Sequence, residues 1–417
     1  MAGCAGMATV TPVFRRATAP FCAVLLALTA AGCLGDDGDD EPRAPEGVLT
    51  VYASMPARGL SADEAAAVEA GARLAFRRAR GKAGPHTVRL VRLDSTRAAG
   101  EPWDPGQVQA NAERAGDDPS AVAYIGELDL GASAISVPVT NDAGLLQVSP
   151  LDSLTSLTQA PPGRAGRGAP ERYYPTGRRT FLRLTPNDLH EVELLTARVG
   201  TLGAQRVALV AGEGVYAEEL VSQLAERLRR VGHTLIAVDN LTDDPASPDA
   251  AAAQLAKERP EAIVYAGHGD RPAERLLASL ARTLPGTPVL MGSGVLDRAP
   301  LPFGQAPVRV EAYSTLRPAA SYGPRAERLL ESVRRSFGDA AARPEALYGH
   351  EAARLVLDAV AEGGGRRGAV VRAALGQGSR RSAVGSYEIT RSGDVTGPPL
   401  TLYRLDNGLF GPPVGPR

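Results

Sequence analysis

The sequence predicts an α/β fold with two lobes. Short apolar runs alternate with stretches of helical periodicity, which is typical of parallel sheets covered by helices. The alternation occurs twice, over residues 48–148 and 188–291, and residues 158–179 between the two series lack it. The chain has 417 residues, 44% of them hydrophobic, which is enough for two large buried cores.

The expected elements follow from the position of each apolar run. Strands in the first series are expected at 48–52, 88–93, 121–125 and 145–148, and helices at 64–80, 107–115 and 132–141. In the second series, strands are expected at 206–210, 234–238, 262–266 and 289–291, and helices at 188–202, 217–231, 250–258 and 272–282. Afterwards come strands at 309–314, 387–389 and 400–405, and helices at 325–337, 351–361 and 366–375. Residues 158–179 are expected to form a long surface loop, either mobile or functional.

Composition excludes several classes of protein. With 46 Lys+Arg against 47 Asp+Glu, the net charge of −1 gives no basic surface for nucleic acid. Three cysteines cannot make a disulfide scaffold. The five histidines are scattered, and no G-x-S-x-G, H-E-x-x-H or cysteine-pair motif occurs. We therefore expect no catalysis, no cofactor and no metal.

The N-terminus has the pattern of an export signal. Arg15 and Arg16 precede a short apolar run that is too short to span a bilayer, and small residues lead up to Cys33. This pattern resembles a bacterial lipobox, so we expect a signal peptide over 1–32, a lipid on Cys33 and a polar tether over 33–47. The protein would be exported and anchored by this lipid to the outer face of the cell membrane, or periplasmic. The alternative is a plain secretory signal in which the cysteine is incidental.

A glycine-rich turn raises the possibility of an oxidoreductase. Gly212, Gly214 and Ala217 form G-x-G-x-x-A between a predicted strand and helix, and Asp239 ends the next strand, which is the context of a dinucleotide-binding fingerprint. The alternative, a tight strand-to-helix turn, is favoured because Glu213 places a carboxylate where phosphates would lie. An exported protein would also meet little nicotinamide cofactor.

Polar loops follow several of the predicted strands. Residues 126–133 lead into a helix whose first N–H groups could hold a ligand carboxylate, and Asp129 could instead cap that helix. Ser149 and the residues after it offer hydroxyl and amide groups at the same sheet edge. His268 follows another strand and either lines a cleft or lies in a solvated loop.

Four phrases in this order resemble the leucine/isoleucine/valine-binding family of periplasmic-type solute-binding proteins. They are I-G-E-L-D-L-G-A-S from Ile125, S-P-L-D-S from Ser149, F-L-R-L-T-P-N-D from Phe181 and Y-A-E-E-L from Tyr216. The resemblance covers most of residues 48–405. It also accounts for the Gly212–Ala217 turn, which in this family shapes the cleft.

The resemblance implies a type 1 periplasmic-binding-protein fold, with two Rossmann-like lobes joined by three crossover segments. The implied crossovers lie near Arg183–Thr185, Tyr313–Leu316 and Gly385–Ile389. The implied lobes are 48–182 plus 317–384 and 183–316 plus 385–417. Such proteins close around a small ligand by hinge motion and present it to an ABC permease in the membrane.

The resemblance also implies a ligand site between the lobes. The expected ligand-binding residues are Asp129, Leu130, Gly131, Ser149, Leu151, Ser153, Tyr216 and His268. The sequence departs from the family in two places. Leu130 replaces a hydroxyl and follows Asp129, and Gly292–Val295 stands where the family has an acid that pairs with the ligand ammonium. The ligand is therefore expected to be an amino-acid-like solute or another small polar or cationic molecule. A ligand-sensing receptor without a transport role and the oxidoreductase remain as alternatives.

Overall fold

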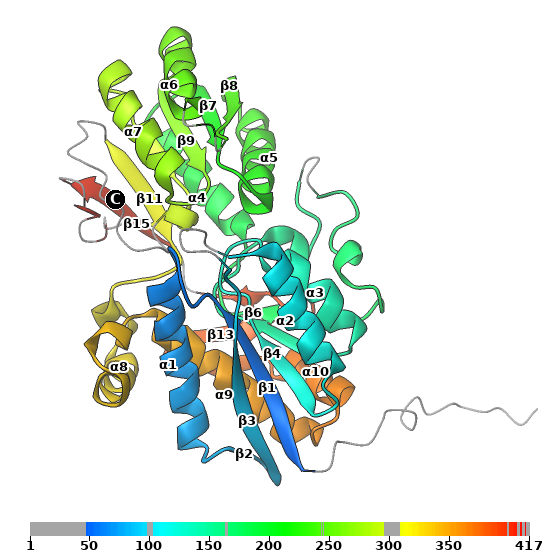
Figure 1. Ribbon diagram of the computed structural model, residues 1–417. Coiled ribbons are helices and arrows are strands. Elements are labelled where there is room, and N and C mark those ends of the chain that lie inside the picture. The colour runs from blue at the N-terminus through cyan, green and yellow to red at the C-terminus, as the bar shows by residue number, and fades with distance from the viewer. Residues whose placement is uncertain are drawn as a thin grey trace, which may run out of the picture. The chain divides into compact units, whose positions relative to one another are not determined.

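The structure, a computed structural model, describes residues 47–97, 103–162, 166–242, 244, 246–295, 309–397, 400–406, 409–410 and 413. In this part of the chain two large sheets form, each with helices on both faces (Figure 1). The predicted two-lobed α/β fold is confirmed. The predicted signal peptide, Cys33 and nearly all of the tether lie outside the described residues.

The sheet of the first lobe has the strand order β2-β3-β1-β4-β5-β6. Its strands are β1 (Val48–Met55), β2 (Lys82–Ala83), β3 (His86–Asp94), β4 (Ala121–Ile125), β5 (Leu146–Ser149) and β6 (Phe181–Arg183). All neighbours pair in parallel except β2, which forms an antiparallel edge with β3. The three-residue β6 was not predicted, because so short a run carries little periodic signal.

Helices cover both faces of this sheet. They are α1 (Ala62–Arg78), α2 (Pro105–Asp117), α3 (Ser133–Asp142), α8 (Pro324–Phe337), α9 (Glu345–Gly363) and α10 (Arg367–Gly376). Leu49 and Val51 of β1 lie in one core with α1 and α9, whereas Tyr52 lies in another with Ala115 of α2. This alternation follows from the period of two in a strand. Figure 1 shows α1 and α9 beside the sheet.

The sheet of the second lobe has the order β16-β15-β11-β10-β9-β7-β8. Its strands are β7 (Arg206–Ala211), β8 (Thr234–Asn240), β9 (Ala262–Ala266), β10 (Val289–Met291), β11 (Val310–Ser314), β15 (Thr401–Asp406) and β16 (Leu409–Phe410). The helices α4 (Asp188–Thr201) and α5 (Val215–Arg230) pack on one face, and α6 (Ser247–Glu258) and α7 (Arg271–Thr283) pack on the other.

The chain passes between the sheets near the predicted positions after β6 and after β11. The third predicted passage, at Gly385–Ile389, lies too early in the chain. A small antiparallel sheet of β12 (Ser379–Arg381), β13 (Ser386–Ile389) and β14 (Val395–Thr396) comes first, and its Tyr387 and Val395 belong to the core of the first lobe. The chain returns to the second sheet only at β15.

The segment 158–179 is not simply a surface loop. Two short 3-10 helices, η1 (Thr155–Leu157) and η3 (Glu171–Tyr173), flank and enter it. Tyr173 and Tyr174 are buried in a core with Phe181, and the Tyr174 hydroxyl donates to the Leu157 carbonyl at 2.6 Å. The prediction of a surface loop was wrong for Tyr173 and Tyr174, because both rings are buried. The many Gly and Pro residues around them had indicated an exposed segment.

Candidate functional site

Loops at the carboxyl ends of the strands of both lobes meet each other. A methyl group placed on Gly131, after β4, would lie 2.6 Å from Val215 Cγ1 at the start of α5. One placed on Gly294, after β10, would lie 3.2 Å from Leu130 Cδ1. Because ligands of parallel α/β sheets bind beyond the carboxyl ends of the strands, this junction is the candidate site.

The amide groups that were expected to hold a ligand carboxylate are bound within the chain. The carboxylate of Asp152 accepts hydrogen bonds from the N–H groups of Gly131 and Ser133, both at 3.0 Å, and from Leu154 at 3.2 Å. Ser149 is also engaged, because its hydroxyl donates to the Glu127 carbonyl at 2.7 Å and accepts from the Asp152 N–H. The Asp152 carboxylate therefore already binds the N–H groups at the N-terminal end of α3.

Asp129 does not cap α3. That position belongs to Ala132, which makes no side-chain cap. The Asp129 carboxylate instead accepts a hydrogen bond from the Ser61 hydroxyl, just before α1, at 2.5 Å, and it is 6% exposed. A buried carboxylate thus faces the space between the lobes from the first lobe.

A small cavity lies at this junction. Its volume is about 20 Å³, and it is lined by Ser61, Glu64, Leu128, Asp129, Leu130, Leu151 and Gly294. This is room for about one water molecule and far below the 300–1,000 Å³ of typical small-molecule sites. The lining leucines and the neighbouring loops fill the junction in this conformation.

Tyr216 and His268 of the second lobe pack together, and Tyr216 lies behind Gly294, which lines this cavity. Their ring centroids are 5.7 Å apart, Tyr216 is buried and His268 is half-buried. The Tyr216 hydroxyl lies 3.5 Å from Glu191 Oε2 and 3.5 Å from the Ser293 hydroxyl. His268 therefore packs against Tyr216, and its role in ligand binding stays a prediction.

Glu191 of α4 occupies the space beside Gly292. Its carboxylate accepts from the Ser293 N–H at 2.6 Å and from the Ser293 hydroxyl at 2.9 Å. A methyl group on Gly292 would lie 2.6 Å from Glu191 Oε1. An acid of α4 thus lies beside Gly292, where the resemblance implied an acid after β10.

Asp188, the first residue of α4, is a buried carboxylate without a hydrogen-bond donor. It is 1% exposed, and among the described residues neither of its oxygens accepts a hydrogen bond. Burial raises its pKa well above the usual range, and the charge of Glu191 raises it further, while the Ser153 hydroxyl and Arg183 oppose this shift. The Ser153 hydroxyl is buried as well and faces this carboxylate.

Negative charge exceeds positive charge around Asp188. Glu219 of α5 is buried too, and its carboxylate accepts from the Ser156 N–H at 2.8 Å, which links the second lobe to η1. Arg183 is the buried cation nearby, but its Nε pairs with Asp394 at 3.1 Å. A cation placed beside Asp188 would relieve the cost of burying these carboxylates.

A family model described as periplasmic binding protein matches residues 53–409. The chain belongs to the periplasmic binding protein family. No curated protein sequence gives a significant match.

Solved structures of this family's type share the fold. A leucine-binding protein from Thermotoga maritima aligns with a TM-score of 0.71 at 21% identity, over 88% of this chain and 99% of that one. A branched-chain amino acid transporter substrate-binding protein from Streptococcus pneumoniae, in complex with isoleucine, gives 0.67 at 16%, over 89% and 100%. A solute-binding protein from R. palustris, in complex with benzoate, gives 0.67 at 16%, over 89% and 98%.

In this periplasmic binding protein the Gly212 turn serves packing. A methyl group on Gly212 would lie 2.8 Å from the Tyr265 hydroxyl and 3.3 Å from Gly267 Cα. Gly214 has a φ of +98°, which begins α5. Both glycines are thus explained by the turn itself.

Of the predicted site residues, the structure brings Asp129, Leu130, Leu151 and Gly131 together with Tyr216 and His268. Ser149 supports the backbone, and Ser153 faces Asp188 instead. Sequence reasoning missed Asp188 and Glu191 as site residues. Both lie in the first turn of α4, where acids are common because they favour the helix dipole, so their sequence signal is weak.

Two further features of the described residues concern membrane insertion and metal binding. No helix there is both long and apolar enough to span a bilayer. In the same residues, no group of three or more His, Cys, Asp and Glu side chains is arranged to hold a metal ion.

Proposed function

We propose that this chain binds one small polar solute between its two lobes, and that the solute carries a cationic group such as the ammonium of an amino acid or amine. The observation that carries this proposal is the Asp188 carboxylate, which is buried with the neutral Ser153 hydroxyl facing it and with no ion pair among the described residues. A buried carboxylate is costly unless it is paired and hydrogen-bonded. An ammonium group would supply both the charge and the donors.

The surroundings of Asp188 support a cation rather than an anion. Glu191 and Tyr216 lie close enough for the charges of Glu191 and Asp188 to raise the pKa of the Tyr216 hydroxyl, beyond the effect of burial. Asp129 adds a further carboxylate from the first lobe. These groups together would attract a cationic solute and repel an anion.

A solute held mainly by its carboxylate is less well supported. The benzoate complex of the R. palustris relative shows that the fold also serves aromatic acids. In this chain, however, the N–H groups of Gly131 and Ser133 are bound to Asp152. A ligand carboxylate would have to displace this resident carboxylate.

Hinge opening of the lobes is part of the proposal. The cavity of about 20 Å³ cannot hold an amino acid, so the lobes have to separate before the solute enters. The crossover segments that join the lobes would act as the hinge, and closure would then bury the solute.

The proposed role is delivery of the solute to an ABC permease, from a position outside the cell membrane. Support comes from membership in the periplasmic binding protein family and from the lipobox-like pattern at Cys33. A lipid on Cys33 followed by a polar tether would keep the lobes near the permease. Permease and ATPase genes beside this gene would favour transport, whereas an adjacent sensor kinase gene would favour a receptor.

Thermal shift and scattering test the proposal together. Amino acids, their amides, polyamines and benzoates are screened, because a ligand that binds only the folded state raises its Tm. The best ligand is then added during small-angle scattering. We expect an amine-bearing compound to raise Tm and to change the scattering curve. An increase in Tm with benzoates alone would contradict the proposal.

A further inference from the structure

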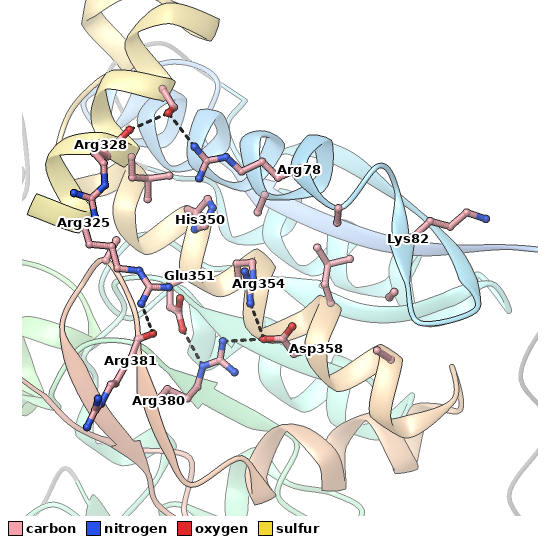
Figure 2. A pocket seen from close by; sticks show the side chains of 18 of the residues that line it. Arg78, Lys82, Arg325, Arg328, His350, Glu351, Arg354, Asp358, Arg380 and Arg381 are labelled. Atoms are coloured by element: carbon pink, nitrogen blue, oxygen red, sulfur yellow. Dashed lines mark hydrogen bonds and ion pairs between the residues drawn. The ribbon is translucent and has the colours of Figure 1, made fainter.

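A second and much larger cavity lies in the first lobe, away from the junction between the lobes. Its volume is about 880 Å³, and it lies between α1, α8, α9 and β12 (Figure 2). This volume is within the range of small-molecule binding sites. None of its lining residues lines the cavity between the lobes. The solute-binding role therefore leaves it without an explanation.

The lining of this cavity has an excess of positive charge. Eight Arg and Lys side chains line it, against four Glu and Asp. Figure 2 shows that these side chains come from opposite walls. The arginines come from four elements, α1, α8, α9 and β12, and like charges that line one cavity repel each other unless a counter-charge lies between them.

Some of these cations are neutralised within the chain and others are not. Arg380 pairs with Glu351 at 2.8 Å, and Arg354 pairs with Asp358 at 3.5 Å. The remaining unpaired arginines line the cavity without a carboxylate partner among the described residues. They are Arg78, Arg325, Arg328 and Arg381.

The few contacts of these four arginines are with neutral groups. Arg78 donates to the Ser332 hydroxyl at 2.9 Å, and Arg325 donates to the Arg381 carbonyl at 2.9 Å. Each guanidinium has five N–H donors, so most of the donors of these four side chains have no partner among the residues that the structure describes.

His350 lies at the base of the same cavity on α9. Its side chain is 9% exposed, and its Nε2 has no hydrogen-bond partner in the described part of the chain. Burial lowers its pKa to about 4, and the charges of Arg78, Arg354 and Arg325 contribute to this. At neutral pH the ring is therefore uncharged, and its buried nitrogen lacks the partner that buried polar atoms normally have.

We propose that this cavity binds a phosphate-bearing small molecule through Arg78, Arg325 and Arg328, with His350 at its base. Guanidinium groups match the geometry of phosphate oxygens and donate two parallel hydrogen bonds to them. The site is separate from the solute site and would serve as a second binding site of the protein. The phosphate can belong to a soluble molecule or to a phospholipid headgroup, since both present the same oxygens.

The test uses inorganic pyrophosphate as the probe and isothermal titration calorimetry of the purified full chain. The informative variant is Arg78→Ala/Arg328→Ala, because both side chains are exposed and neither pairs with a carboxylate in the described residues. The matched control is Arg229→Ala, an exposed arginine on α5 of the other lobe. Equal Tm values of the three proteins show that folding is intact.

We expect saturable binding of one pyrophosphate, at least tenfold weaker in the double variant and unchanged in the control. Vesicles of phosphatidylglycerol and of phosphatidylcholine form the second arm, with protein that carries Cys33→Ala so that no lipid anchor contributes. If the protein binds vesicles but not pyrophosphate, and the double variant loses vesicle binding, the phosphate belongs to a lipid headgroup. Absence of binding in both arms, or equal binding by the double variant, would overturn the proposal.

Discussion

The carboxylate of Asp152 accepts a hydrogen bond from the Gly131 N–H at 3.0 Å, where the sequence predicted a cradle for a ligand carboxylate. The Ser133 and Leu154 N–H groups complete the set. The chain therefore stabilises the N-terminal end of α3 with its own side chain. This hydrogen bonding changes which solute we expect. The anion site of the first lobe is already occupied by Asp152, and the buried Asp129 adds a negative charge, so a cationic solute is favoured.

Asp152→Ala should destabilise the protein. The substitution leaves three buried N–H groups without an acceptor, and hydrogen bonds to a charged group contribute about 1.5–3 kcal/mol. We expect a loss of ~3 kcal/mol in the free energy of unfolding, measured by urea denaturation. Asp142→Ala, at the exposed C-terminal end of the same helix, should change it by less than about 0.5 kcal/mol. Similar losses in both variants would contradict the capping role.

Glu127 should make stability depend on pH. Burial raises the pKa of Glu127 to about 8, although the Tyr124 and Ser54 hydroxyls donate to its carboxylate at 2.6 and 2.9 Å. The folded chain thus holds a proton that the unfolded chain releases near pH 4.5. The stabilisation of the folded state by this buried, protonated carboxyl group is complete below pH 4.5 and is lost as pH rises through about 8.

Glu127→Gln removes this titration. The free energy of unfolding is measured at pH 5, 7 and 9 for both proteins. From pH 5 to pH 9 it should decrease by a few kcal/mol more in the wild type than in the variant. Glu113→Gln, an exposed substitution on α2, should leave the wild-type slope unchanged. A slope that is the same in Glu127→Gln would mean that Glu127 is ionised in the folded protein.

The crossing of α1 and α9 should tolerate no side chain at Gly349. A methyl group there would lie 1.9 Å from the Val68 carbonyl oxygen, and one on Gly71 would lie 1.9 Å from the Ala346 carbonyl oxygen. Gly349→Ala should cost ~3 kcal/mol, because backbone has to move to make room. Gly200→Ala, in α4 with no atom within 4 Å, should stabilise by about 0.5–1 kcal/mol. Thermal denaturation compares the two, and equal Tm changes would refute the close approach.

Cys33→Ala tests the predicted lipid anchor. If Cys33 carries the lipid, the variant should move from the membrane fraction to the soluble fraction after cell breakage. Cys22→Ala, within the predicted signal peptide, is the control and should leave the protein in the membrane fraction. Unchanged fractionation of Cys33→Ala would show that the cysteine is incidental.

Sequence periodicity predicted most of the fold. Strands β4, β9 and β10 begin and end where the apolar runs do, because a strand buried on both faces reads as a continuous run. Helix α9 starts at Glu345, six residues before the predicted start at 351, since buried residues such as Tyr348 and Gly349 pack all round it and weaken the pattern. Because α9 also packs tightly against α1, its first turns show no alternation of apolar and polar residues at helical spacing.

The site was predicted less fully, for a physical reason. The ordered phrases located the loops of Asp129, Leu151 and Tyr216, because loops after parallel strands share one sheet edge. They did not indicate that Asp152 reaches the amides of α3, or that Glu191 fills the space beside Gly292. Such contacts join elements that are distant in sequence, and only the packing of those elements places them together.

The central claim is recognition of a cationic group by Asp188, and calorimetric titration of Asp188→Asn tests it most directly. The titrant is the amine-bearing solute found by thermal shift, together with its N-acetylated form, which lacks the charge. Asp117→Asn, an exposed substitution at the end of α2, is the control. We predict that the wild type and the control bind the amine and that Asp188→Asn binds it at least tenfold more weakly, with acetylation causing a similar loss. Equal affinity of Asp188→Asn and the wild type for the amine would contradict the account.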